Sequence, residues 1–314
     1  MKRILVTGGA GNVGGALVRA LIKDPGNSVC IVDSLVTSSL AKLPSREPGR
    51  YEFIQADVNN YSELAPVMTA GKFDYVFHYA ALVGVQRTLQ NPMRVLEDIE
   101  GIKNVLCLAR DTGVQRVFYS SSSEVYGEPV EFPQHEVTTP LNSRLPYAIV
   151  KNVGEAFCRT FQQEFGLNYT VFRLFNTYGP GQSSDFVILK FIEAALSGSD
   201  LTLFGDGRQT RTFCYIGDNI EVTEKILNEE LCRNTVINLG SDLEYPILEV
   251  ARLVKEITRS KSAIVHLPAL PEGDMTRRQP DISKMRAILG RELTPLRVGI
   301  QKILKCRFNF DAKG

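Results

Sequence analysis

Short runs of β-branched and aromatic residues alternate with longer stretches of helical periodicity through about the first 175 residues. The runs predict six strands, at residues 3–7, 28–33, 51–55, 75–78, 116–120 and 169–174. The stretches between them predict helices that include residues 13–23, 93–112 and 147–166. This alternation is typical of a parallel sheet wrapped by helices. We therefore expect an α/β, doubly wound fold that binds its ligand beyond the carboxyl ends of the strands.

The pattern changes after Asn176, where glycine, proline and serine gather at residues 177–184. A helix near residues 186–197, a strand at 201–204 and a turn at 205–211 are expected to follow. Residues 236–240 again have the composition of a buried strand. The sequence thus predicts a larger domain over residues 1–176, to which residues 212–240 partly return, and a smaller C-terminal domain over residues 177–314.

Composition limits the class of protein. The chain has 314 residues, of which 44% are hydrophobic and 23% charged, so we expect a self-supporting globular core. The formal net charge of +1 gives no general attraction to nucleic acid or to an anionic membrane. The six cysteines have no Cys-x-x-Cys spacing and are expected to be reduced thiols in the core. Neither a signal peptide nor an apolar run of roughly 20 residues is found, which predicts a cytoplasmic protein.

Three glycines, Gly8, Gly11 and Gly14, stand between the first predicted strand and the first predicted helix. Glycine allows a tight turn there and lets the backbone and the helix N-terminus approach a pyrophosphate. The second predicted strand ends at Asp33. Strand, glycines, helix and acid in this order form the dinucleotide-binding fingerprint of a Rossmann sheet.

Asp33 also indicates which dinucleotide is bound. A carboxylate accepts hydrogen bonds from the ribose hydroxyls of NAD and repels the 2′-phosphate of NADP. No basic residue follows Asp33 until Lys42, so we expect NAD. Asp57 and Val58, after the third strand, are candidate adenine contacts, although an aspartate at this point can instead cap the next helix.

Tyr147 and Lys151 are four residues apart on a predicted helix, so their side chains project from one face. A nearby ammonium stabilises a phenolate, and we expect it to lower the pKa of Tyr147 below the usual value of about 10. The preceding strand runs into four serines at residues 120–123, followed by Glu124. Tyr147 is therefore a candidate base, with hydroxyls and a carboxylate as its neighbours.

Seven motifs together resemble the extended short-chain dehydrogenases/reductases, and within them the NAD-dependent nucleotide-sugar epimerase/dehydratase family. They are TGGAGNVG at 7–14, HYAA at 78–81, SSSEVYG at 121–127, YAIVK at 147–151, RLFNTYGP at 173–180, GDGRQTRTF at 205–213 and RRQPDISK at 277–284. The likeness is strongest to the members that resemble UDP-glucuronate decarboxylase. It implies an enzyme with tightly bound NAD and no metal, in which the first domain binds NAD and the second binds a nucleotide sugar.

The resemblance also implies the roles of the central residues. In this family the tyrosine takes a proton from the sugar C4 hydroxyl, while the C4 hydrogen passes to NAD and a serine or threonine holds the hydroxyl. By position these residues are Tyr147 and Ser122, and Lys151 also binds the nicotinamide ribose. The expected cofactor site further includes Asn12, Val13, Ala80 and Ala81.

The fate of the 4-keto sugar separates the subfamilies. Dehydratases and glucuronate decarboxylases keep a glutamate where Glu124 stands, whereas galactose-type epimerases carry a small or apolar residue. Ser123 stands where glucose-type 4,6-dehydratases have aspartate. Arg278 matches the arginine that decarboxylases place near the substrate carboxylate. UDP-glucuronate decarboxylase is therefore the favoured prediction, with a 4,6- or 5,6-dehydratase and a UDP-sugar 4-epimerase as alternatives.

One loop departs from the decarboxylase pattern. Residues 82–92 read LVGVQRTLQNP, where typical decarboxylases have Pro-Ala-Ser before Asn-Pro. Arg87 in this loop is a candidate contact to sugar or phosphate, or else a surface arginine. A non-catalytic module that senses NAD is the alternative from a different class, but such a module need not keep the hydroxyl, tyrosine and lysine together.

The resemblance assigns the substrate nucleotide to the second domain. It implies that Asn176 contacts the diphosphate, that the backbone from Leu201 to Phe204 faces a base, preferably uracil, and that Arg211 contacts phosphate or ribose. It also implies a homodimer formed by helices at residues 95–109 and 150–165. Apolar residues on the first of these helices are Leu96, Ile99, Val105, Leu106 and Cys107, which could instead face their own sheet.

Overall fold

The computed structural model describes residues 1–44, 50–268 and 277–308, and the chain divides into two compact units. Unit 1 comprises Met1–Gly127, Pro140–Leu174 and Ile220–Asn238. Unit 2 comprises Glu128–Thr139, Phe175–Asn219 and Leu239–Gly314. The chain therefore passes between the units several times. The functional division, with NAD bound by residues 1–176 and nucleotide sugar by residues 177–314, stays a prediction.

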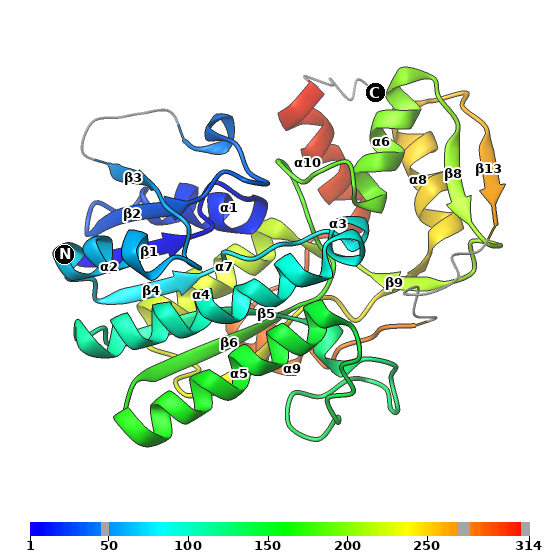
Figure 1. Ribbon diagram of the computed structural model, residues 1–314. Helices are drawn as coiled ribbons and strands as arrows, with labels where there is room; N and C mark the ends of the chain where they lie inside the picture. The colour runs from blue at the N-terminus through cyan, green and yellow to red at the C-terminus, as the bar shows by residue number, and fades with distance from the viewer. Residues whose placement is uncertain (45–49, 269–276, 309–314) are drawn as a thin grey trace. The chain divides into compact units, whose positions relative to one another are not determined.

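Unit 1 is built on a sheet of seven strands, counted over the described residues, in the order β11-β6-β5-β4-β1-β2-β3 (Figure 1). The strands are β1 (Lys2–Thr7), β2 (Asn27–Asp33), β3 (Tyr51–Gln55), β4 (Tyr75–His78), β5 (Arg116–Ser122), β6 (Asn168–Leu174) and β11 (Thr235–Leu239). β1 pairs in parallel with β2 and β4, and β5 pairs in parallel with β4 and β6. The doubly wound α/β fold is thereby confirmed. The strand order reverses between β1 and β4, which is where such sheets bind ligands.

Helices cover the sheet because successive side chains along each strand point to opposite faces. The helices of this unit are α1 (Asn12–Leu21), α2 (Tyr61–Gly71), α3 (Val85–Gln90), α4 (Pro92–Asp111), α5 (Pro146–Phe165) and most of α7 (Ile216–Asn228). Val76 and Val117 pack in one core with residues of α2, α4 and α5. Phe77 and Phe118, one residue along, point to the opposite face, and their rings stack with centroids 4.2 Å apart. α4 and α5 run side by side (Figure 1).

All six strands predicted in this unit are present, but β5 is longer than expected. It continues through Ser121 and Ser122, because these residues pair with Arg173 and Leu174 of β6. Ser122 therefore lies on a strand, where its position is fixed by the ladder. The helix predicted at residues 147–166 begins one residue earlier, at Pro146, a residue that favours the first helical turn.

Unit 2 combines short strand pairs with helices around a core of its own. The pairs are β7 (Thr177–Tyr178) with β10 (Cys214–Tyr215), β9 (Thr210–Thr212) with β12 (Glu244–Pro246), and β8 (Leu201–Phe204) with β13 (Ile264–Leu267). The helices are α6 (Val187–Ser197), α8 (Ile247–Thr258), α9 (Ser283–Leu289) and α10 (Leu296–Phe308). Ile192, Leu203, Val254 and Ile300 join α6, β8, α8 and α10 in this core. The predicted helix near residues 186–197 and the predicted strand at 201–204 are confirmed.

The interpretation of every cysteine as a core residue needs correction. All six are free thiols, and Cys30, Cys158 and Cys214 are buried as expected. Cys306, on α10, is exposed, so the interpretation is wrong for that residue. Its helix turns this position away from the core that holds Ile303 and Leu304.

The apolar residues named for a homodimer divide between core and surface. Val105 and Leu106 on α4 are buried in their own unit, as the alternative held. Leu96 is 38% exposed, and Met93, one turn earlier, is 72% exposed. Ile149 on α5 is 41% exposed. The homodimer stays a prediction, and these three exposed side chains are its candidate contacts.

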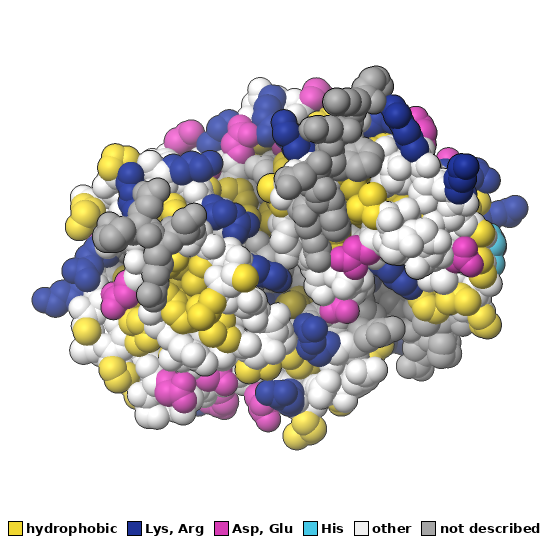
Figure 2. Space-filling view, turned by 90° about the horizontal axis from the view of Figure 1, so that it is seen from above, with side chains coloured by type: hydrophobic (Ala, Val, Ile, Leu, Met, Phe, Trp, Pro, Cys, Tyr) yellow, Lys and Arg dark blue, Asp and Glu magenta, His cyan; other side chains and the backbone are white. Residues whose placement is uncertain are grey.

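The surface carries charges of both signs. Basic and acidic side chains are interspersed over the face shown in Figure 2, in keeping with the net charge of +1. Within the described parts of the chain, no helix has the length and apolar character needed to cross a bilayer. The cytoplasmic location stays a prediction.

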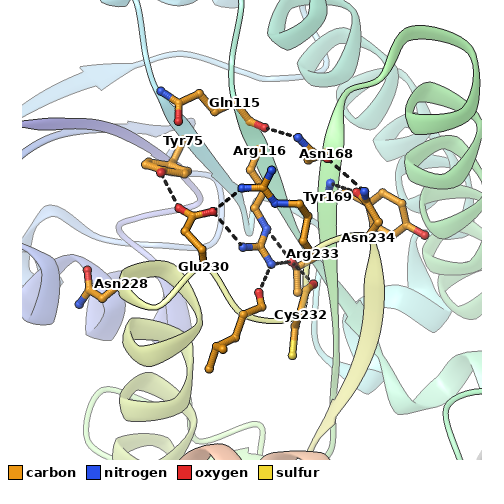
Figure 3. A network of polar contacts seen from close by, with 12 residues as sticks. Tyr75, Gln115, Arg116, Asn168, Tyr169, Asn228, Glu230, Cys232, Arg233 and Asn234 are labelled. Atoms are coloured by element: carbon orange, nitrogen blue, oxygen red, sulfur yellow. Dashed lines mark hydrogen bonds and ion pairs between the residues drawn. The ribbon is translucent and has the colours of Figure 1, made fainter.

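A buried arginine lies at the amino end of β5, in the middle of the sheet. Arg116, the first residue of β5, is 1% exposed and donates through Nε to Thr170 Oγ1 at 2.9 Å. It also donates to the Leu231 carbonyl, and its Nη1 lies 3.9 Å from Glu230. Glu230 accepts from the Tyr75 hydroxyl at 2.7 Å (Figure 3). These contacts tie β4, β5 and β6 to the turn that follows α7.

Replacing Arg116 with methionine should lower the free energy of unfolding by about 3 kcal/mol, because two oxygens lose their donor and Glu230 loses a cation. Arg233→Gln is the matched control. Arg233 also pairs with Glu230, at 2.8 Å, but its side chain is 52% exposed, so its loss should cost about 0.5 kcal/mol or less. Urea denaturation measures the free energy of unfolding of both variants. An equal loss of stability in the two would contradict the claim that burial makes the Arg116 contacts the stronger ones.

Candidate active site

The loop between β1 and α1 has the geometry of a phosphate cradle. Gly8 has a φ of +69°, and a Cβ there would lie 2.6 Å from the Ala80 nitrogen, so the segments after β1 and β4 meet more closely than a side chain permits. At Gly14 a Cβ would lie 2.3 Å from the Gly8 carbonyl oxygen. The N-cap of α1 is Gly11, which has no side chain to cap the first amides. These amides remain available to an anion.

Two polar side chains complete the fit to NAD. Asn12 Oδ1 is buried and has no hydrogen-bond partner among the described residues. Asp33, 7% exposed, accepts through Oδ2 from the Ala10 nitrogen at 2.9 Å, and through Oδ1 from the Leu35 nitrogen at 2.9 Å and Ser38 Oγ at 2.5 Å. These bonds fix the carboxylate beside the glycine loop, where the adenosine ribose is expected. Val13 and Ala81, also predicted for this site, are half-buried on α1 and after β4.

The two candidate adenine contacts, Asp57 and Val58, differ in how deeply they are buried. Val58 is 7% exposed and packs in the hydrophobic core, so its backbone rather than its side chain remains for a ligand. Asp57 is half-buried and accepts from the Asn59 nitrogen at 2.9 Å. The alternative role of Asp57 as a helix cap is wrong, because α2 begins after Asn60, whose side chain accepts from the Ser62 nitrogen.

The catalytic candidates meet where β5 ends against α5. Lys151 is 3% exposed, and its Nζ donates to the Ser120 carbonyl at 2.8 Å and lies 5.7 Å from the centroid of the Tyr147 ring. Ser122 Oγ accepts from the Glu124 nitrogen at 3.2 Å, which caps the short 3-10 helix η2 (Ser123–Tyr126). Ser123 itself is 3% exposed. Hydroxyl, phenol, ammonium and carboxylate are thus brought to one end of unit 1.

The expectation that the pKa of Tyr147 is lowered is wrong, because the surrounding protein groups raise it. Burial raises the pKa of this phenol, the Glu124 carboxylate adds to the rise, and hydrogen bonding to Ser122 opposes it. Burial also lowers the pKa of Lys151 to about 8, against an opposing effect of Asp98. Helical spacing put the two groups on one face but could not show that both are desolvated.

A family model described as the NAD-dependent epimerase/dehydratase family matches residues 4–240. The chain belongs to this family. The resemblance seen in the motifs is confirmed, and with it NAD as the cofactor and an enzymatic activity of this family's kind.

Relatives within the family differ in their names. The UDP-N-acetyl-alpha-D-glucosaminuronate decarboxylase of Bacillus cytotoxicus is 35% identical over 298 residues, which cover 91% of each chain. UDP-glucuronic acid decarboxylase 1 of Danio rerio is 34% identical over 312 residues, 97% of this chain and 72% of the relative. Among solved structures, the UDP-glucose 4-epimerase of Thermotoga maritima with UDP-glucose has a TM-score of 0.90 at 30% identity and covers 96% of this chain and 97% of that one.

Five of the predicted substrate-binding residues lie in unit 2. Asn176 has a φ of +36°, and its Nδ2 donates to the Thr212 carbonyl at 3.0 Å. Arg211 Nη1 donates to the Thr210 carbonyl at 2.7 Å. The strand from Leu201 to Phe204 pairs with β13, so its backbone is held in an extended form. Arg278 is 6% exposed, a strong degree of burial for a guanidinium.

Arg87 belongs to unit 1 instead. It lies on α3, and its Nη1 donates to the Val83 carbonyl at 3.0 Å. This bond holds the arginine against the loop that departs from the decarboxylase pattern. A contact to substrate by Arg87 stays a prediction.

Sequence reasoning missed Asp98. Its Oδ2 accepts from the Leu82 nitrogen at 2.8 Å, and its charge raises the pKa of Lys151. The signal was available in the helix pattern, because Asp98 falls between the buried Val95 and Ile102 at helical spacing. An acid on the core-facing stripe of a helix indicates a buried partner.

Oxidation of substrate should lose rate as the pH rises above about 8, because the pKa of Lys151 lies there and the ammonium is the form that donates to Ser120. Asp98→Asn should move this alkaline limb to lower pH, because the carboxylate that raises the pKa of Lys151 is gone. The measurement is the pH dependence of NADH absorbance formed in a single turnover. Glu97→Gln, at an exposed position of the same helix, is the control, and an unmoved limb in Asp98→Asn would contradict the coupling.

Proposed function

We propose that this enzyme oxidises C4 of a UDP-linked hexuronate and then decarboxylates it, with UDP-glucuronate as the substrate. The observation that carries the proposal is Glu124, a carboxylate close enough to Tyr147 to raise its pKa, in a chain whose relatives at 34% and 35% identity are named decarboxylases. A 4-epimerase has no step that requires such a carboxylate. The relatives' names support a UDP-linked acid sugar.

Each residue of the cluster has a part in the proposed reaction. Tyr147 takes the proton of the C4 hydroxyl, and Ser122 donates a hydrogen bond to the oxygen as its charge develops. Lys151 holds a positive charge beside the phenolate that forms. NAD, when bound, accepts the C4 hydrogen with its electron pair and later returns it.

Decarboxylation follows from the ketone at C4. The carboxylate carbon C6 is attached to C5, so the ketone lies β to it and the C5–C6 bond breaks with its electron pair passing into a C4–C5 enolate. Carbon dioxide leaves, and C5 then takes up a proton. This proton comes from solvent, and we assign its delivery to the Glu124 carboxyl group, which stands in the turn next to Ser122. Reduction at C4 completes a UDP-pentose.

A UDP-sugar 4-epimerase is the second candidate. Its support is the likeness to the UDP-glucose 4-epimerase structure at a TM-score of 0.90. That reaction would use Tyr147, Lys151 and Ser122 in the same way and would return the hydrogen to the other face of C4.

Mass spectrometry of product from UDP-glucuronate, UDP-N-acetylglucosaminuronate and UDP-glucose, with NMR to detect a C4 isomer of unchanged mass, decides between the candidates. We expect loss of carbon dioxide from the first, and a fall of about 10²- to 10⁴-fold in Tyr147→Phe. Glu124→Gln should lower decarboxylation about 100-fold, whereas the exposed Glu128→Gln should not. A C4 isomer of UDP-glucose without decarboxylation, with Glu124→Gln fully active, would establish the epimerase instead.

Arg278 has a natural control in its neighbour. If Arg278 binds the substrate carboxylate, Arg278→Gln should raise the KM for UDP-glucuronate about 10- to 100-fold and leave binding of UDP-glucose nearly unchanged. Arg277, whose side chain is 45% exposed and pairs with Glu244 at 2.7 Å, should tolerate the same replacement. Steady-state kinetics with UDP-glucuronate and isothermal titration of UDP-glucose measure the two effects. Equal weakening of the acid and the neutral sugar would remove Arg278 from carboxylate recognition.

A further inference from the structure

Behind the catalytic cluster lies an ion pair that no step of the proposed reaction uses. Glu155, on α5, is 0% exposed, and Arg173, on β6, is 2% exposed. Arg173 donates to Glu155 through two nitrogens, from Nε to Oε1 at 2.9 Å and from Nη2 to Oε2 at 2.7 Å. Ser121 Oγ donates to Oε1 as well, at 2.7 Å. The carboxylate is therefore held by three hydrogen bonds from two strands.

The arginine extends the network toward η2. Its Nη1 donates to the Tyr126 hydroxyl at 2.8 Å, and its guanidinium lies 4.7 Å from the centroid of that ring. The Tyr126 hydroxyl donates in turn to Asn238 Oδ1 at 2.8 Å. Tyr126 is 1% exposed and Asn238 0%, so the whole chain of bonds is shielded from water. Shielded, bidentate bonds fix geometry more strictly than exposed ones.

The members of this network are immediate neighbours of the catalytic candidates. Ser121 stands between Ser120 and Ser122, and the Ser120 carbonyl accepts the hydrogen bond from Lys151 Nζ. Tyr126 is the last residue of η2, the turn that contains Glu124. Glu155 follows Lys151 by four residues on α5, so the two side chains lie on one face of the helix. The network thus joins the strand end, the turn and the helix that carry the reacting groups.

Stability alone does not explain a charged pair at this place. Apolar side chains of similar volume often hold a core as well as a buried ion pair, because both charges lose their hydration. Hydrogen bonds have a preferred direction, which apolar contacts lack. They can therefore fix both the rotation of a helix about its axis and its position along a neighbouring strand. The pair is also neutral as a whole, so it orders the site while adding little net field at Tyr147.

We propose that Glu155 and Arg173 are positioning residues, which hold Ser121 and Tyr126 and thereby set Ser122 and Glu124 against Tyr147 and Lys151. The inference rests on the proposed function of those four groups in oxidation at C4. It assigns to the pair no contact with substrate or cofactor. Loss of the pair should therefore slow the chemical step without weakening substrate binding.

The test replaces both charges together, as Glu155→Met with Arg173→Met, so that neither is left buried without its partner. We expect kcat with UDP-glucuronate to fall about 10- to 100-fold, because displacements of the order of an ångström have effects of this size. KM and the thermal midpoint should change little. A purely structural role would instead lower the thermal midpoint and leave kcat per folded molecule unchanged, and that result would overturn the inference.

Two single variants guard against a failure to fold. Ser121→Ala removes one hydrogen bond and leaves the ion pair, and it should lower kcat about 2- to 10-fold at unchanged KM. Arg159→Gln is the matched control, because Arg159 reaches the same carboxylate at 3.6 Å but is 47% exposed and touches neither Ser121 nor Tyr126 through a described bond. Wild-type kcat in Ser121→Ala, or an equal loss in Arg159→Gln, would overturn the positioning role.

The two proposals fail in different ways. If the wild-type protein converts none of the UDP-sugars to a product, or if Tyr147→Phe stays active, the proposed function fails and the inference falls with it. If the wild-type protein is active, Tyr147→Phe is inactive and the paired methionine variant keeps the wild-type kcat, the inference alone is overturned.

Discussion

The buried ammonium of Lys151 is the constraint on which the catalytic end of unit 1 depends. Its side chain is 3% exposed, and the bond that holds it is donated to a neutral carbonyl, that of Ser120. The ring of Tyr119 lies 5.3 Å away and that of Tyr147 5.7 Å, so aromatic faces share in the stabilisation. A cation placed in this way is costly, and the fall of its pKa to about 8 expresses that cost.

The neighbours of Lys151 are arranged so that no second cation competes with it. His78, at the end of β4, is 3% exposed, and burial together with Lys151 lowers its pKa to about 3, so the imidazole is neutral at ordinary pH. Its Nδ1 lies 2.8 Å from Thr7 Oγ1 at the start of the glycine loop. Arg173 is charged but paired with Glu155. Of Lys151, His78 and Arg173, Lys151 is thus the one that is charged and has no carboxylate hydrogen-bonded to it among the described residues.

What the sequence predicted well is what depends on local geometry. The strands of unit 1 follow from runs of β-branched residues, and the glycine loop follows from the close approach of backbone at Gly8 and Gly14. What it missed depends on partners distant in the chain. β5 extends to Ser122 because β6 pairs with it, and Asp98 and Glu155 find their partners in other elements.

Errors at single residues have the same origin. The adenine contact of Val58 stays a prediction, but its side chain packs in a core formed by three helices and the sheet, so only the backbone remains for that contact. The pKa of Tyr147 was expected to fall because Lys151 lies four residues along α5. It is raised instead, because the phenol is buried, and the spacing of residues does not indicate burial. The spacing of residues along a helix shows which side chains are neighbours, whereas their burial determines the direction in which their pKa values shift.

Unit 1 contains every group that oxidation at C4 requires in the proposed scheme, and this has a consequence for how the reactions of the family differ. The roles proposed for Tyr147, Lys151 and Ser122 are the same whether decarboxylation, dehydration or epimerisation follows the oxidation. The distinction must then come from groups that act after the ketone has formed. Glu124 is such a group in unit 1, because it affects the phenol without belonging to the oxidation itself. In unit 2 Arg278 is a buried guanidinium, and recognition of an acid sugar is the role proposed for it. In the proposed scheme, these two residues direct the keto sugar to decarboxylation rather than epimerisation, while the oxidation site stays the same.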